Sequence, residues 1–231
     1  MAYVINGRED FAVNGVSART VGLVVDTLAP PPMAQPRYSA YPVGRESDLI
    51  IREGDFDDIE YHIAARVIRP ESYDNSAIYA YLNGAKTLRI AKLTGKEYRV
   101  QRVLGIVPTA RLRGIECAYD IGFVLAPFKY AADETAIAVD GTIENPGALP
   151  SRPIFTGTAA AGATLTVNGE TLTFTAAMQF TVDAERMIVA NGNALDTIHT
   201  VGLLPMLQPG INTVSTTGIE NLRCKVNARW Y

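Results

Sequence analysis

Histidine, cysteine and tryptophan are scarce in this chain of 231 residues, which has two histidines, two cysteines and one tryptophan. Neither His62 nor His199 has a partner at the HxH or HExxH spacing of metal sites, so both are interpreted as ordinary surface or edge residues. Cys117 and Cys224 fit no CxxC spacing and lie in alternating apolar runs, which favours two buried free thiols. A disulfide between them stays open, although nothing in the pattern demands an oxidising compartment.

Long hydrophobic runs are missing as well. No apolar run approaches the ~20 residues that a membrane helix needs. The N-terminus lacks the basic start and apolar stretch of a signal peptide, so we expect a soluble protein made in the cytoplasm. Hydrophobic residues make up 48% of the chain and charged residues 19%, which is a globular composition. The net charge of -3 gives no electrostatic reason to expect tight binding to phosphate backbones.

Sequence signatures of catalysis are also absent. The chain has no GxSxG nucleophile elbow and no GxGxxG or GxxxxGK[ST] phosphate loop. A pair of catalytic carboxylates stays open, because the members of a glycosidase pair can lie far apart in sequence. We therefore expect a protein that is not an enzyme, with no catalytic residue, no metal site and no cofactor.

The densest acidic segment, residues 53–60, includes Asp55, Asp57 and Asp58. Several carboxylates close together are what a calcium ion prefers, but the spacing fails the pattern of an EF-hand loop. A solvated segment, or one that protects a strand edge, is therefore favoured over a metal site.

A basic segment, residues 86–113, includes Arg99 and Arg102. Nucleic-acid binding is disfavoured, because few aromatic residues are interleaved with the basic ones and the whole chain is acidic. We expect instead a contact between copies of the chain, in which this basic segment meets the acidic segment of a neighbour.

Two domains are predicted from the distribution of charge. Charged residues are dense up to about residue 140 and sparse beyond it. The change coincides with a turn-rich stretch, Gly141–Pro153, that contains Asn145-Pro146-Gly147. A run of turn-forming residues between two patterned segments is typical of a domain boundary, so we divide the chain into residues 1–140 and 141–231.

The second domain reads as all β. Thr164–Val167 and Glu170–Phe174 alternate apolar and polar residues on either side of Asn168-Gly169, a dipeptide suited to tight hairpin turns. Leu222–Trp230 alternates too and is predicted as a strand, and no helical period is convincing after residue 150. A β-sandwich of short strands is the expected architecture.

The first domain is predicted to be β-rich with one short helix. Residues 59–68 alternate in the manner of a strand, and strands are also expected at 87–91, 98–107 and 115–125. The helix is expected over Ser72–Leu82, where Asn83-Gly84 ends it. Prolines at 30–32 and 36 predict an extended segment without ladder pairing.

Five short segments, in order over nearly the whole chain, resemble segments of the distal tail (Dit) proteins of long-tailed bacteriophages. They are Phe11–Ser17 with Val21–Val24, Tyr41–Leu49, Ser76–Gly84 with Leu88 and Tyr98, Pro127–Tyr130 with Ile143–Gly147, and Leu204–Val214. The first is similar to the family's opening "f-x-i-N-G" and the third to its helix ending in "W-L-N-G". Tyr81 stands where the family often has Trp, and Ser47 replaces a common Gly.

The resemblance implies a structural hub at the tip of a phage tail. Its first domain would form a homo-hexameric ring, and its second domain, a galectin-like or jelly-roll β-sandwich, would point outward. The implied partners are the tail tube protein above, a tail-associated (tape-end or lysin-type) protein below, and receptor-binding or other baseplate proteins. DNA would only pass through the ring and would not be bound specifically.

The ring implied by the resemblance suggests roles for particular residues. A proline-rich arm at 26–45 that does not pair within its own sheet is suited to reach a neighbour, and Tyr38, Tyr41 and Arg45 are candidate contacts because interfaces favour Tyr and Arg. Arg99 and Arg102 are further candidates from the basic segment. The carboxylates at 55, 57 and 58 would line the lumen, where they would let DNA slide.

Two other classes of function stay open. The first is a carbohydrate-binding β-sandwich module, although the second domain has few aromatic residues on which a sugar could stack. The second is a hydrolase, for which no nucleophile, metal set or histidine pair is present. Other contractile or gene-transfer particles use similar hubs, so the kind of particle also stays open.

Overall fold

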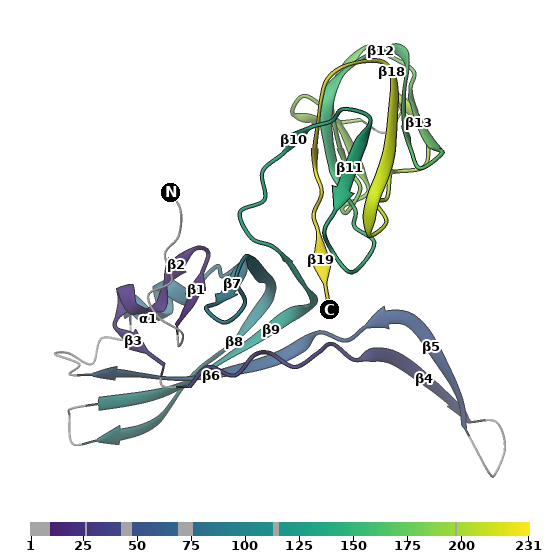
Figure 1. The fold of residues 1–231 in the computed structure, drawn as a ribbon. Coiled ribbons are helices and arrows are strands. Elements are labelled where there is room, and N and C mark those ends of the chain that lie inside the picture. Colours follow the sequence, from purple (N-terminus) through teal and green to yellow (C-terminus); the bar gives the residue numbers. More distant parts are fainter. Residues whose placement is uncertain (1–9, 26, 43–47, 69–75, 113–115, 197) are drawn as a thin grey trace. The chain divides into compact units, whose positions relative to one another are not determined.

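The computed structural model describes residues 10–25, 27–42, 48–68, 76–112, 116–196 and 198–231 (Figure 1). The chain forms two compact units, unit 1 with Met1–Lys129 and Tyr231, and unit 2 with Tyr130–Trp230. Strands make up most of the described residues, and α1 (Ser76–Leu82) is the one α-helix among them. The expected fold, mainly β with a short helix in the first part of the chain, is confirmed.

The main sheet of unit 1 has the strand order β2-β1-β7-β8-β9-β6-β3. Its strands are β1 (Phe11–Val13), β2 (Val16–Ser17), β3 (Leu23–Val24), β6 (Ile59–Ile68), β7 (Thr87–Ile90), β8 (Lys96–Leu112) and β9 (Glu116–Ala131). The predicted strands are all present, and β8 and β9 are longer than the sequence indicated. The helix is found over Ser76–Leu82, and the preceding residues of the predicted helix lie outside the described ones.

The core of unit 1 follows the alternation read from the sequence. Ile59, Tyr61 and Ile63 on β6 are buried, and Ile63 lies opposite the buried Ile121 of β9. From α1, Ile78 and Leu82 join the same cluster, so the helix covers this face of the sheet. Burial of one such side chain contributes about 1.5–3 kcal/mol, so the shared face holds strand and helix together.

The Asn14-Gly15 turn ties the start of the chain to the end of α1. Asn14 and Gly15 have φ of 51° and 78°, which suits the tight turn between β1 and β2. The Asn14 side chain accepts hydrogen bonds from the backbone N–H groups of Lys86 (2.8 Å) and Thr87 (3.1 Å) and donates one to the Gly84 carbonyl (3.1 Å). Two of the segments that carried the family resemblance thus pack against each other.

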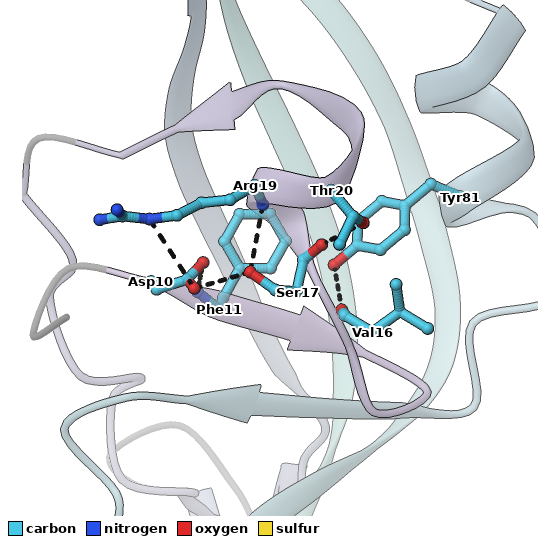
Figure 2. Close-up of polar contacts among 7 residues, drawn as sticks. All are labelled: Asp10, Phe11, Val16, Ser17, Arg19, Thr20 and Tyr81. Atoms are coloured by element: carbon cyan, nitrogen blue, oxygen red, sulfur yellow. Dashed lines mark hydrogen bonds and ion pairs between the residues drawn. The ribbon is translucent and has the colours of Figure 1, made fainter. Parts of the chain in front are cut away.

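Tyr81 makes a second tie between α1 and the β1–β2 hairpin (Figure 2). Its hydroxyl accepts a hydrogen bond from the backbone N–H of Val13 (3.0 Å) and donates one to the Val16 carbonyl (2.8 Å). Beside it, the buried Asp10 carboxylate accepts hydrogen bonds from the Phe11 N–H (2.8 Å) and the Ser17 hydroxyl (2.7 Å). These bonds satisfy polar groups that burial would otherwise leave unpaired, and they fix the position of α1.

The strands β4 (Pro36–Pro42) and β5 (Asp48–Phe56) form a separate two-stranded sheet, called the arm from here on. The prediction that this proline-rich segment lacks ladder pairing is therefore wrong from Pro36 onward. Pro36 and Pro42 stand at the two ends of β4, and the arm has no third strand, so positions without a donor N–H are tolerated there. Leu28 and Ala34, which precede the arm, are buried in the core of unit 1.

Unit 2 is built from nine strands, with the order β10-β18-β12-β14-β15-β16, while β11 pairs with β18 and β13 pairs with β12 and β17. The strands are β10 (Ile137–Ala138), β11 (Thr142–Asn145), β12 (Ile154–Val167), β13 (Glu170–Phe174), β14 (Met178–Asp183), β15 (Ile188–Asn191), β16 (Ala194–Leu195), β17 (Thr200–Gly202) and β18 (Gly210–Lys225). The border expected at residue 140 falls after β10, whose strand partner β18 belongs to unit 2.

The predicted hairpin at Asn168-Gly169 is confirmed. Leu165 lies opposite Leu172 across the turn, and both are buried. The predicted last strand is interrupted, because β18 ends at Lys225 and β19 begins only at Arg229. The interruption follows from Asn227, which has a φ of 54° and uses its side chain to donate to the Arg152 carbonyl (2.9 Å).

A single buried asparagine organises the loop that leads into β18. The Asn212 side chain is fully buried and accepts from the Gln208 N–H (2.7 Å) and the Asn168 amide (2.7 Å). It also donates to the carbonyls of Gln208 (2.9 Å) and Gly210 (2.9 Å). Asn212 belongs to one of the segments that carried the resemblance, so that segment holds a turn in place.

We predict that Asn212→Ala lowers the free energy of unfolding of unit 2 by about 2–4 kcal/mol, because it leaves several buried polar groups without partners. The control is Asn193→Ala, at an exposed asparagine, with an expected change within about 0.5 kcal/mol. Urea unfolding followed by the fluorescence of Trp230 measures both, because this single tryptophan packs against the unit 2 core. Equal midpoints for the two variants would contradict the assignment.

Candidate assembly surfaces

The arm exposes large apolar side chains on both of its faces. Tyr38 lies opposite Arg52, and Ala40 lies opposite Ile50, so these four side chains share one face. The exposed fractions are 57% for Tyr38 and 66% for Ile50. On the other face Ile51 is 45% exposed. A two-stranded sheet is marginally stable by itself in water, so these side chains need a further surface to cover them.

The base of the arm is fixed by aromatic contacts. Phe56, the last residue of β5, packs against Phe128 with ring centroids 5.2 Å apart and against Tyr231 with centroids 5.8 Å apart. An ion pair between Arg37 and Asp57 (2.9 Å) lies nearby and raises the pKa of the Arg37 guanidinium, chiefly through the hydrogen bond to Asp57. The arm is therefore anchored at its base, while its middle stays exposed.

A groove of about 610 Å³ lies between α1, with the residues that follow it, and strand β8. Tyr79 and Ala80 line it from the helix, and both are exposed. Val103 and Ile106 line it from the strand and are half-buried. Hydrogen bonds of Tyr81 to the β1–β2 hairpin, and of Asn14 in that hairpin to the residues after α1, hold this wall of the groove in place. The groove has a mixed lining, because Asn83, Gln101 and Arg102 contribute polar groups beside these apolar side chains.

The predicted contact residues fall on these two surfaces to different extents. Tyr38 is on the arm, and Arg102 is exposed and lines the groove. Arg99 is half-buried on β8, opposite Thr87 of β7, and does not line the groove. The backbone of Tyr41 belongs to β4, whereas its side chain and the whole of Arg45 lie outside the described residues.

The three carboxylates predicted to line a lumen are all exposed. Asp55 belongs to β5, and Asp57 and Asp58 lie between β5 and β6. Among the residues that the structure describes, no group of three or more metal-ligating side chains is placed to hold a metal ion. Whether these carboxylates face a lumen stays a prediction.

A cluster around His62 was not expected from the sequence. The Nδ1 atom of His62 is 2.9 Å from the Asp120 carboxylate, and Nε2 is 3.0 Å from the Glu60 carboxylate. Both nitrogens donate only when the ring is protonated, so Glu60 first and Asp120 second raise the pKa of His62. The E-x-H spacing on β6 places Glu60 and His62 on one face, which is a usable sequence signal, but the partner Asp120 becomes adjacent only through the β6–β9 pairing.

We predict that His62 titrates above the model-peptide value of about 6.5. Because the folded pKa is raised, the stabilisation from protonation is fully present below the unfolded pKa and is lost as the pH rises through the folded pKa. Proton NMR titration of the imidazole resonances measures this, with His199→Gln to assign them. Glu60→Gln is expected to lower the pKa of His62. A pKa at or below 6.5 that is insensitive to Glu60→Gln and to Asp120→Asn would contradict the cluster.

Unit 2 has two exposed features of its own. A pocket of about 400 Å³ is lined by uncharged residues. They are Thr156, Gly157, Thr158, Gln179, Phe180, Thr181, Gly192, Asn193 and Asn221. Separately, Leu195, Ile198, Val201 and Leu203 form an exposed apolar stretch of the chain, each of them more than 60% exposed. Large apolar side chains that stay exposed are candidates for contact with another protein.

Among the residues that the structure describes, no helix is long and apolar enough to cross a membrane. A scan of protein-family models finds no match to this sequence, and a search of curated proteins finds none either.

Among solved structures, the fold is similar to the crystal structure of SPP1 Dit (gp 19.1). The TM-score is 0.69 over 93% of this chain and 96% of that chain, and the sequences are 14% identical. That protein is described as a paradigm of the hub adsorption apparatus in Gram-positive-infecting phages. The resemblance seen in the five sequence segments is thus confirmed at the level of the fold. The similar protein is described as a hub, which is a structural role.

Proposed function

We propose that this chain is a structural hub protein of a phage tail tip, which assembles into a hexameric ring in the virion. The observation that carries the proposal is the arm, whose large apolar side chains Tyr38 and Ile50 are exposed among the residues that the structure describes. Burying a side chain such as Ile50 or Tyr38 stabilises by about 1.5–3 kcal/mol, which favours a neighbouring copy as the cover. The similarity to a phage hub protein supports the same role.

A ring follows if the arm of each copy contacts a different surface on the next copy. Such a contact is heterologous, and it either closes into a ring or continues as a filament. In the proposed ring, residues 1–140 form the annulus, and Tyr41 and Arg45 add contacts next to Tyr38. The carboxylates of Asp55 and its neighbours line the lumen, where their negative charge keeps passing DNA from sticking.

The second domain, residues 141–231, then serves as the outward docking platform. Its exposed apolar side chains, Leu195, Ile198, Val201 and Leu203, suit a receptor-binding or other baseplate protein, because protein interfaces have an apolar centre. The tail tube protein and a tail-associated protein bind the two faces of the ring. The chain is made in the cytoplasm of the bacterial host and acts at the virion tail tip.

The proposal predicts that Tyr38→Ser combined with Ile50→Ser disrupts self-assembly, because it removes the apolar area that drives the contact. Sedimentation velocity at micromolar concentration measures the effect as a shift from the oligomer to the monomer. The matched control, Ile198→Ser with Val201→Ser, also removes two exposed apolar side chains, but from unit 2, and is expected to leave the oligomer intact. An arm variant that sediments like the wild type would contradict the role of the arm.

A carbohydrate-binding module is the second candidate function, and the uncharged pocket of unit 2 favours it. Hydroxyl and amide groups such as those of Thr156, Gln179 and Asn193 are suited to hydrogen-bond a sugar, and the volume is in the range of small-molecule sites. This candidate predicts binding on a glycan array that is lost in Gln179→Ala combined with Asn193→Ala. An array without signal for the wild type would remove this function and leave the hub proposal standing.

A further inference from the structure

We propose that residues 27–35, called the strap from here on, guard one edge of strand β6 against pairing with a strand of another chain. The strap leads from β3 to the arm and includes Pro30, Pro31 and Pro32. This inference goes beyond the proposed ring and does not depend on it. Three observations lead to it, namely the open edge of β6, the path of the strap along that edge and the chemistry of the strap.

One edge of β6 has no strand partner over most of its length. On one side, β9 pairs with β6 from Ile59 to Ile68. On the other side the neighbour in the sheet is β3, which pairs with β6 at Arg66 and Val67. Among the residues that the structure describes, no strand therefore covers residues 59–65 on that side. An open strand edge is a site at which a strand of another chain can bind.

The strap runs along this edge of β6 (Figure 1). Its path is fixed at both ends, because β3 pairs with β6 before it and the Gln35 carbonyl accepts a hydrogen bond from the Asp57 N–H (2.9 Å) after it. Residues 25–35 thus cover the same distance as the shorter stretch 57–65. Paired strands advance residue for residue, so the strap cannot match β6 as a regular partner strand.

The strap is held by its buried side chains. Leu28, Pro31 and Ala34 are buried, whereas Pro30 and Pro32 are exposed. Burial at every third residue matches the polyproline II conformation, which has three residues per turn and no internal hydrogen bonds. Leu28 and Ala34 belong to the core of unit 1, so the strap packs onto unit 1 through this face.

The polar contacts of the strap use its carbonyl groups. The Lys92 ammonium group donates a hydrogen bond to the Leu28 carbonyl (2.8 Å), and the hydroxyl of Tyr61 on β6 donates one to the Ala29 carbonyl. The prolines at 30–32 have no backbone N–H and cannot donate. An added strand needs both donors and acceptors along an edge, so the strap is a poor template for another chain.

The arm gives the chain a reason to guard this edge. The strap continues into β4, and β6 follows β5 after two residues, so the open edge of β6 lies next to the arm. If that edge were accessible, copies of the chain could pair through it in registers that compete with a specific contact. By covering the edge, the strap leaves the arm as the accessible two-stranded surface of this part of unit 1.

The first experiment converts the strap into a segment that can form a strand. Pro30→Thr with Pro32→Thr restores two backbone N–H groups at exposed positions and introduces a residue type that favours strands. The matched control, Pro146→Thr with Pro209→Thr, replaces two exposed prolines of unit 2 and gives the unfolded chain the same gain in freedom. Light scattering on a sizing column and thioflavin T fluorescence measure association, and circular dichroism checks that each variant is folded.

We expect the strap variant to shift from the wild-type species to larger species that bind thioflavin T, whereas the control keeps the wild-type mass. A strap variant with the wild-type mass and no thioflavin T signal would overturn the inference. Equal association of the strap variant and the control would also overturn it, because lost stability alone would then account for both.

A second experiment loosens the strap without changing its prolines. Lys92→Met removes the donor to the Leu28 carbonyl, and Lys86→Met, at an exposed lysine between α1 and β7, is the control. Hydrogen exchange followed by mass spectrometry reports on peptides that cover residues 59–65. We expect faster exchange in Lys92→Met than in the wild type, and no change in Lys86→Met. Unchanged exchange in Lys92→Met would contradict a strap that covers this edge, whatever the oligomeric state of the protein.

Discussion

A two-stranded ribbon cannot bury its own apolar side chains, and the proposed assembly of this protein depends on this constraint. The arm has only two strands, and Tyr38, Ile50 and Ile51 are exposed on it. An exposed pair of strands with apolar faces invites pairing with another chain, which proteins usually avoid unless the contact is functional. Here the base of the arm is anchored by Phe56, Phe128 and Tyr231, so the exposed apolar side chains lie on an anchored segment.

Elsewhere in unit 1, side-chain hydrogen bonds hold α1 in place. The hydroxyl of Tyr81 and the side-chain amide of Asn14 join α1, the β1–β2 hairpin and the start of β7 through short hydrogen bonds. These two side chains form hydrogen bonds with backbone groups that would otherwise bond to water. They thereby hold the helix in one position against the sheet. The groove beside α1 thereby has a defined shape. A preformed binding surface loses little conformational entropy when a partner binds.

The residues that made the fold predictable from sequence are those that hold turns and cores. Asn14-Gly15, Asn168-Gly169 and Asn212 leave a readable signal because few residue types tolerate a positive φ or saturate a buried turn with hydrogen bonds. The alternation of apolar and polar residues over 59–68 also predicted the buried face of β6, because successive side chains of a strand point to opposite faces. In contrast, the prolines at 30–32 and 36 suggested an unpaired segment, because sequence alone does not show that β4 is an edge strand.

The candidate surfaces could be predicted only in part. Tyr38 and Arg102 were selected by residue type, and the structure places the first on the arm and the second at the groove. The groove itself depends on α1 and β8 lying side by side, and the His62 cluster depends on the β6–β9 pairing. Both are long-range contacts without a local pattern. The pocket of unit 2 was missed for the same reason, since its lining comes from four separate segments of the chain.

The proposed assembly of this chain with copies of itself into a closed ring determines the solution mass of the wild-type protein. Light scattering on a sizing column, at micromolar concentration and moderate salt, is expected to give six times the chain mass of 25.0 kDa, or twelve times if two rings stack back to back. A single species of 25.0 kDa at every concentration would contradict self-assembly of the isolated chain.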